Sequence, residues 1–152
     1  MNMDKTKTTK FLINKQPAIW FWIISVIALL WFLMDTSAFF MRVLMTEDML
    51  ISMPENQRLH IQNIPFWVNF VFAFEVFGGT LGCLTLLLRK KLAKHFFIIS
   101  LLGVLSQTTY IYFFSNSIAT IGMTAVVMPL IAIMIGIGMI VVSKISISKG
   151  WL

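Results

Sequence analysis

The stretch PFWVNFVFAFEVFGGTLGCLTLLLR, residues 65–89, decides the fold of this chain. It is a largely apolar segment that ends at the basic residues Arg89, Lys90 and Lys91, and it is long enough to cross a bilayer as one helix. A single carboxylate, Glu75, lies inside it. Helical spacing places this acid on one stripe with Gly78, Gly79 and Gly82. Because an acid is costly to expose to lipid, we expect the stripe to face other helices.

The composition of the whole chain agrees with a membrane location. Of the 152 residues, 59% are hydrophobic and only 12% are charged, about half the roughly 25% charged share of soluble domains. The mean hydropathy is +0.88. The length accommodates one domain of about four spans of ~20–25 residues each.

The rare residue types exclude several classes of protein. One cysteine, Cys83, rules out a disulfide within the chain, and no sequence motif for a metal, a cofactor or a catalytic nucleophile is present. The net charge of +6 does not indicate nucleic-acid binding, because the positive residues stand at the ends of the apolar runs. We therefore expect no enzyme activity, no cofactor, no metal and no nucleic-acid partner.

The order of apolar and polar segments predicts an all-α membrane protein. We expect an antiparallel bundle of four transmembrane helices in one membrane domain, residues 17–144, between a basic tail, residues 1–16, and a short tail, residues 145–152. The expected spans are residues 17–41, 65–89, 92–114 and 118–143. An external segment, residues 42–64, connects the first two spans.

The external segment carries two helix-start signals. Thr46 precedes two acidic residues, and Pro54 precedes Glu55, which suits a first helical position for the proline. One or two short helices are expected there. They either connect the spans and cover the bundle, which is what external loops usually do, or act as a lid over a cavity.

The distribution of positive charge sets the expected orientation. Ten basic residues fall on one side of the membrane: four lysines before residue 16, then Arg89, Lys90, Lys91, Lys94, Lys144 and Lys149. The other side has only Arg42 and Arg58. The positive-inside rule then places both termini in the cytoplasm.

Small and polar residues also form stripes on the later spans, as helix packing in lipid requires. The third span has a stripe of Ser100, Gly103, Gln107 and Tyr110. The fourth has residues at spacings of three, four, three and four, which is typical of a packing seam: Gly122, Ala125, Pro129, Ala132 and Gly136.

The polar residues of the stripes predict a shared interior site. Glu75 lies roughly 15 Å into the membrane at about 1.5 Å per residue, with Gln107 at similar depth. Tyr110 and Asp35 lie further outward. The expected spans hold basic residues only at their ends, far from Glu75. Glu75 is therefore neutralised either by a proton or a bound cation that exchanges with a solute, or by hydrogen bonds to Gln107 or Tyr110 that join helices.

Several motifs resemble one family. They are MTEDML-x-x-MPE-x-x-R at 45–58, IP-x-WV at 64–68, VFGGTLGCLTLLLRKK at 76–91, FIISLLGVL-x-Q at 97–107 and the SKGWL ending. Together they are similar to small bacterial four-span membrane proteins of DoxX-like architecture, some of them labelled sugar transporter. The resemblance implies the bacterial inner membrane as the location. Gln107 and Pro129 fit the pattern of that family, whereas Asp35 and Glu75 stand where its members usually have small or apolar residues.

Three functional hypotheses remain open from the sequence. The first is that the chain, surrounded by membrane lipids, binds or transports a small polar solute near Asp35, Glu75, Gln107 and Tyr110, as a homo-oligomer if it transports. The second is an accessory or scaffold role through the glycine faces. The third, which the resemblance suggests, is a DoxX-like redox partner.

Overall fold

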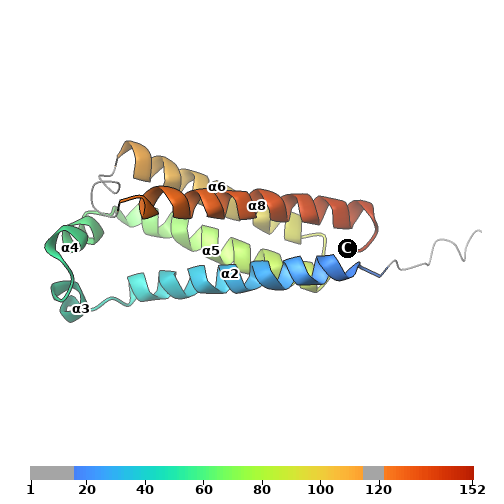
Figure 1. Cartoon of the computed structure of the whole chain (residues 1–152), viewed down its shortest axis with the longest axis horizontal. Helices are drawn as coiled ribbons and strands as arrows, with labels where there is room; N and C mark the ends of the chain where they lie inside the picture. The colour runs from blue at the N-terminus through green and yellow to red at the C-terminus, as the bar shows by residue number, and fades with distance from the viewer. Residues whose placement is uncertain (1–15, 115–121) are drawn as a thin grey trace, which may run out of the picture.

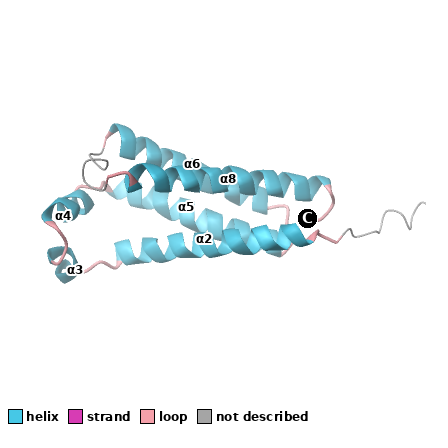
Figure 2. Ribbon diagram, in the orientation of Figure 1, coloured by secondary structure: helices cyan, strands magenta, loops and turns pink. Residues whose placement is uncertain are grey.

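The computed structural model describes residues 16–114 and 122–152, and helices make up most of this part (Figure 1). No strand occurs among these residues, and short loops join the helices (Figure 2). The described helices, in chain order, are α2 (Ile19–Val43), α3 (Glu47–Ile51), α4 (Glu55–Gln62), α5 (Phe66–Leu87), α6 (Ala93–Phe113) and α8 (Thr124–Ser148).

Four of these helices, α2, α5, α6 and α8, are long and apolar enough to cross a membrane. They run antiparallel, with the start of α2, the C-terminus and the α5–α6 turn at one end of the bundle, and α3 and α4 at the other (Figure 1). The predicted all-α fold of four membrane-spanning helices is therefore confirmed, and the chain is a multi-pass membrane protein. Two short helices follow the first span, as the segment 42–64 predicted.

The ends of two spans differ from the predicted ones. Helix α2 continues to Val43, so Arg42 belongs to its last turn rather than to the external segment. Helix α8 begins at Thr124 and continues to Ser148. The predicted start of that span, residues 118–121, lies outside the described residues.

Gly122 is a correction to the predicted packing seam. It precedes α8 in a turn, with a φ of 72°, and a Cβ added there would meet no described atom within 4 Å. Glycine is suited to this position because its backbone adopts positive φ without steric cost. The residue therefore serves the turn and is not part of the α8 contact surface.

The four long helices do not pack equally on one another. Helix α5 makes its largest contact with α6, α2 packs on α5, and α8 packs on α6. Helices α2 and α8 touch at only a few points, which leaves the bundle open along one side. This arrangement places α5 and α6 at the centre, with α2 and α8 as their outer neighbours.

Glycines allow α5 and α6 to approach closely around Glu75. A Cβ on Gly103 would lie 3.0 Å from the backbone nitrogen of Glu75, and one on Gly78 would lie 3.1 Å from the backbone nitrogen of Ser100. In this contact the Ser100 hydroxyl donates a hydrogen bond of 2.8 Å to the carbonyl oxygen of Glu75. Small residues and a polar link together fix the register of the two helices.

The other two glycines of the deciding stretch receive aromatic rings from two different helices, Gly79 from α2 and Gly82 from α6. A Cβ on Gly79 would overlap the ring of Phe32, and one on Gly82 would lie 2.7 Å from the ring of Phe97. The hydroxyls of Thr36 and Thr80 are hydrogen-bonded at 3.0 Å. The stripe of Glu75 and the three glycines is thus buried, as its spacing predicts.

The α8 seam continues beyond the predicted residues. Ala125 and Gly136 are buried, Pro129 and Ala132 are partly buried, and the same alternation of three and four residues carries on to Met139, Ser143 and Ser146. Gly136 lets Leu101 of α6 approach, since an added Cβ would lie 3.3 Å from its Cδ1. The seam therefore holds α8 on α6 along most of its length.

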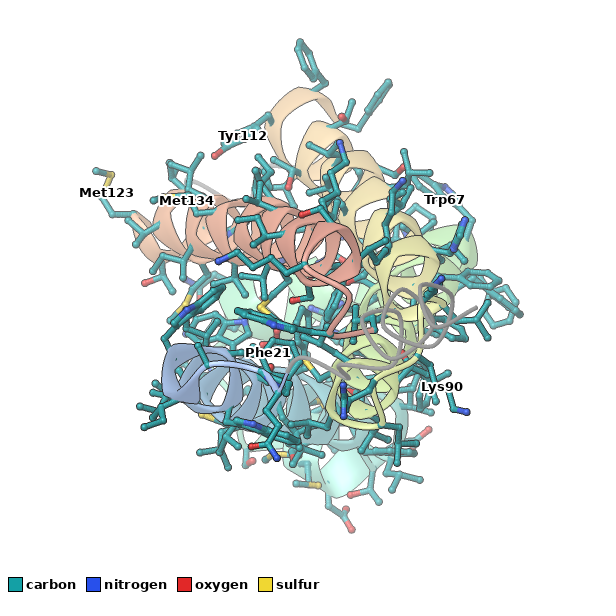
Figure 3. All side chains as sticks on the ribbon, turned by 90° about the vertical axis from the view of Figure 1, so that its right-hand side faces the viewer. Phe21, Trp67, Lys90, Tyr112, Met123 and Met134 are labelled. Carbon is teal, nitrogen blue, oxygen red and sulfur yellow. The ribbon has the colours of Figure 1, made fainter. Side chains whose placement is uncertain are left out.

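The end of the bundle that bears the start of α2 and the C-terminus is filled by apolar side chains, and we call it the closed end. Phe21 lies at its centre (Figure 3), and Phe32, Cys83, Leu86, Phe97, Met139 and Trp151 belong to the same core cluster. The end of the expected tail, residues 145–152, is packed into this core, because Trp151 is buried against Trp20 and Phe21 at ring distances of 5.5 and 5.9 Å.

The last residues reach this position by a tight helix ending. Gly150 has a φ of 70°, and the Trp151 N–H donates to the carbonyl of Ser146 at 2.8 Å. This is the bonding of a Schellman motif, which reverses the chain after α8. Arg89, at the end of α5, then donates from Nε to the carbonyl of Trp151 at 2.7 Å.

The close contact at Gly79 predicts that a larger residue at this position destabilises the protein. We expect Gly79→Ala to lower the free energy of unfolding by about 1–3 kcal/mol, because the added methyl group must displace the packed Phe32 ring. Reversible unfolding in mixed detergent micelles measures this. The matched control is Gly138→Ala on α8, where an added Cβ meets no described atom within 4 Å. Equal effects of the two substitutions would contradict the close α2–α5 contact.

The burial of Trp151 gives a second stability prediction. We expect Trp151→Ala to lower the free energy of unfolding by about 3 kcal/mol, because the truncation leaves a cavity beside Trp20 and Phe21. The control is Phe113→Ala, since the Phe113 side chain is 79% exposed on α6. The melting temperature of each purified variant measures the difference. A Trp151→Ala protein as stable as the Phe113→Ala protein would show that the chain end does not pack as described.

Candidate functional site

The half of the bundle near α3 and α4 is hollow, in contrast to the closed end. Its largest polar hollow, which we call the acidic cavity, has a volume of about 370 Å³ and is bordered by all four long helices. This lies within the roughly 300–1,000 Å³ range of small-molecule sites. Its lining includes Asp35 from α2, Glu75 from α5 and Gln107 and Thr108 from α6, among apolar side chains that include Trp31, Met34, Phe72, Val104, Met128 and Pro129.

Glu75 is the most deeply buried polar group of the acidic cavity. The residue is 6% exposed, and its Oε2 atom has no hydrogen-bond partner within the described part of the chain. Its backbone is fixed from α6 by Ser100 and by the close approach of Gly103. The expected helix-joining bond from Gln107 or Tyr110 does not reach Oε2 of Glu75 among the residues described.

Asp35 and Gln107 complete the polar lining. The charge of Asp35 acts on Glu75, so the two acids share one electrostatic environment although they come from different helices. The indole N–H of Trp31 lies close enough to stabilise the Asp35 carboxylate, yet it forms no hydrogen bond of standard geometry. Gln107 has a buried amide oxygen that lacks a partner among the described residues.

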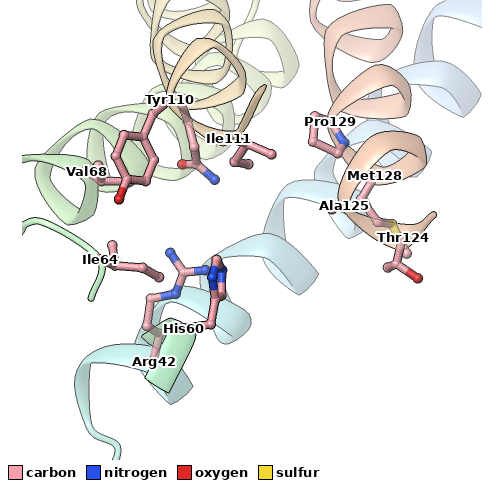
Figure 4. A pocket seen from close by; sticks show the side chains of 11 residues that line it. Arg42, His60, Ile64, Val68, Tyr110, Ile111, Thr124, Ala125, Met128 and Pro129 are labelled. Atoms are coloured by element: carbon pink, nitrogen blue, oxygen red, sulfur yellow. The ribbon is translucent and has the colours of Figure 1, made fainter. Parts of the chain in front are cut away.

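A second hollow, the vestibule, adjoins the acidic cavity toward α4. It has a volume of about 200 Å³ and shares Gln107, Met128 and Pro129 with the acidic cavity. Figure 4 shows Arg42 and His60 reaching into the vestibule opposite Tyr110, with Thr124 and Pro129 on another side. Tyr110 thus lines the vestibule rather than the acidic cavity, and its ring packs edge-on against Trp67 at 5.4 Å.

Arg42 is the functional candidate that the sequence interpretation missed. Its positive charge acts on both Glu75 and His60, so a basic residue within a span does face the interior, contrary to expectation. The available signal was spacing: Arg42 lies seven residues after Asp35, or two helical turns along the same face. The predicted end of the first span at residue 41 concealed this relation.

His60 of α4 lies outside the spans and faces the vestibule. Partial burial lowers the pKa of its imidazole, and the positive charge of Arg42 lowers it further. Both causes disfavour the imidazolium form. His60 is therefore the neutral member of the pair at pH values where an ordinary surface histidine is partly charged.

A third hollow lies on the open side of the bundle between α2 and α8, and we call it the lateral groove. Its volume is about 500 Å³, and almost all of its lining is apolar, including Ile27, Ile135, Gly138 and Met139. Trp31 and Met34 line both the lateral groove and the acidic cavity. The acidic cavity therefore adjoins the vestibule at one side and the lateral groove at another.

The described residues offer no ready metal site. No three side chains of His, Cys, Asp or Glu converge within residues 16–114 and 122–152. Cys83 is buried in the core cluster of the closed end, away from both polar hollows. The arrangement thus presents acceptor atoms and charge in a largely apolar cavity.

Comparison with known proteins gives no family assignment. Neither a protein-family model, a curated protein nor a solved structure matches this chain. The functional argument therefore rests on the geometry of the three hollows.

The electrostatic relation of His60 and Arg42 can be tested directly. We expect Arg42→Gln to raise the pKa of His60, because one of the two causes that lower it is removed while burial remains. The imidazole resonance of His60, followed by nuclear magnetic resonance against pH in a His95→Gln background, measures the change.

The control for this titration is Arg58→Gln. Arg58 stands two residues before His60 on α4, and residues at that spacing do not face each other on a helix. This control should leave the His60 titration in place. If Arg42→Gln has no effect either, the side chain of Arg42 does not share the vestibule with His60.

Proposed function

We propose that this chain is a multi-pass protein of a bacterial cytoplasmic membrane that binds a small polar solute in the acidic cavity and carries it across. Both termini then lie in the cytoplasm, since ten of the twelve basic residues of the sequence come before α2, around the α5–α6 turn or near the end of α8. The vestibule, with α3 and α4, faces the outside. Solute binding explains the hollow half of the bundle, which a purely structural helix bundle does not require.

The observation that carries the proposal is the state of Glu75. A buried acid with a carboxylate oxygen that lacks a partner costs free energy, and proteins retain such groups chiefly at functional sites. Here the acid also lines a cavity of about 370 Å³, whose walls are apolar with a few polar groups. A ligand in the cavity would supply the missing partner.

One chain is sufficient to build this binding site. Asp35, Glu75 and Gln107 come from three helices of a single chain, and α8 closes the remaining wall through Pro129 and Ala132. A homo-oligomer, if it forms, therefore serves transport or stability rather than assembly of the site. Pro129 lies at the boundary of the acidic cavity and the vestibule, where its missing N–H leaves the carbonyl of Ala125 without its usual helical partner.

A ligand screen tests the proposed function. We expect at least one of four solute classes, namely neutral sugars, amino acids, organic amines and inorganic anions, to raise the melting temperature of the purified protein. A ligand at 100 times its Kd stabilises the folded state by about 2.7 kcal/mol. The same solute should exchange in proteoliposome counterflow, and Glu75→Gln should abolish both effects.

The matched control is Glu47→Gln, which removes an exposed carboxylate on α3 and leaves the cavity unchanged. This variant should bind and exchange the solute as the original protein does. If none of the four classes stabilises the original protein, the binding proposal fails. An accessory role is then favoured, and co-purification of a membrane partner that depends on the glycine faces is the measurement that supports it.

A further inference from the structure

We propose that the solute of the acidic cavity is a small apolar amine in its protonated form, held between Asp35 and Glu75 and admitted from the bilayer through the lateral groove. The inference rests on the proposed function and specifies the substrate class of that same site. It follows from four features of the hollow half: the acceptor atoms, the charges, the walls and the two openings.

The polar atoms that lack partners in the acidic cavity are chiefly acceptors. Oε2 of Glu75 and the amide oxygen of Gln107 are both buried and lack partners among the described residues. Asp35 adds a second carboxylate to the lining. A complementary ligand must donate hydrogen bonds to more than one of these oxygens, and an ammonium group has several N–H donors on one atom.

The charges select a monovalent cation. Asp35 and Arg42 each act electrostatically on Glu75 in this part of the bundle. The site therefore offers two carboxyl groups against one guanidinium, and when both acids are ionised around a bound ligand, one ammonium group balances the remaining negative charge. An anionic solute would increase the imbalance, and a neutral sugar would leave it uncorrected. Because uncompensated charge is costly in a low-dielectric interior, the cationic ligand is favoured.

The walls of the acidic cavity distinguish an organic cation from a metal ion. Hard metal ions need about six oxygen ligands, whereas most of this lining is apolar, with Trp31, Phe72 and Met128 among its members. Aromatic side chains suit an organic ammonium, since they contact its carbon atoms and attract its charge through the ring face. The structure thus favours a ligand with one charged end and one apolar end.

The two openings differ in charge, which determines the route of entry. The vestibule has Arg42 on its lining, so a cation from the aqueous phase meets this positive charge before it reaches the acids. The lateral groove is lined almost entirely by apolar residues and shares Trp31 and Met34 with the cavity. An apolar amine that partitions into the bilayer as the neutral base can therefore reach Asp35 and Glu75 from the lipid side, where it accepts a proton from one of the two carboxyl groups and is held as the ammonium beside the resulting carboxylate.

A series of matched ligands tests the substrate class. Isothermal titration of the whole protein in nanodiscs compares protonated phenethylamine with phenethyl alcohol, which lacks the charge, and with hydrocinnamate, which has the opposite charge. We expect phenethylamine to bind about tenfold or more tightly than either of the others. Asp35→Asn and Glu75→Gln should each weaken its binding about tenfold, in line with the loss of one partner of a buried charge contact.

Arg42→Gln tests the charge argument, because the expected change is a gain in phenethylamine affinity, whereas a substitution that only disturbs the fold would lower this affinity. Removing the positive charge should strengthen phenethylamine binding, because the net negative charge around Glu75 increases. Arg58→Gln, on α4, is the matched control and should leave affinity unchanged. This test remains informative if Glu75→Gln does not fold.

A substitution in the lateral groove tests the proposed entry route. Gly138 lines the lateral groove, and an added Cβ there meets no described atom within 4 Å, so Gly138→Phe should fill the groove without disturbing the helix contacts. We expect slower phenethylamine association, by about tenfold or more. The control is Leu102→Phe, at a position on α6 that is 59% exposed.

The outcomes separate this inference from the proposed function. If the alcohol or a sugar binds as tightly as phenethylamine, the amine class is wrong although solute binding in the cavity stands. If neither phenethylamine nor any class in the screen binds, both proposals fail. Weaker amine binding in Arg42→Gln would overturn the charge argument. An unchanged association rate in Gly138→Phe would overturn entry from the bilayer.

Discussion

The close approach of α5 and α6 around Glu75 is the contact on which the rest of the structure depends. Lipid provides little apolar driving force for helix association, so the two central helices must gain stability from packing and polar links. Gly78 and Gly103 allow the backbones to approach, and the Ser100 hydroxyl bonds to the Glu75 carbonyl. This contact fixes the acid toward the interior, and α2 and α8 then pack on the outer sides of the central pair.

The two ends of the bundle have different roles: one end is packed and stabilises the fold, and the other contains the candidate site. At the closed end, Phe21, Phe97 and Trp151 fill the space between the helices, and the C-terminal turn seals it. Toward α4, the same helices enclose the acidic cavity and the vestibule. A packed half can hold the helices together while the hollow half bears buried charge, since the stability lost at one end is offset at the other.

The sequence predicted those features that depend on periodicity. The stripe of Glu75 and its glycines, and the α8 seam through Ala125, Pro129 and Gly136, follow from helical spacing alone. Arg42 and Trp151 were missed because hydropathy does not locate helix ends, and a shift of two residues at the end of α2 moves Arg42 from the external loop to the interior. Gly122 was misplaced because its spacing matched the seam, although its backbone conformation serves a turn.

The hydrogen bonds around Glu75 show why its carboxylate is available to a ligand. Ser100, on the adjacent helix, donates to the backbone carbonyl of Glu75 rather than to its carboxylate. In the same part of the bundle, the Gln107 amide oxygen is also left without a partner among the described residues. A structural role for the acid calls for a donor directed at it, as buried polar groups normally have. The described packing instead fixes the backbone of Glu75 and leaves its side chain facing an enclosed space, which is the arrangement that a binding site requires.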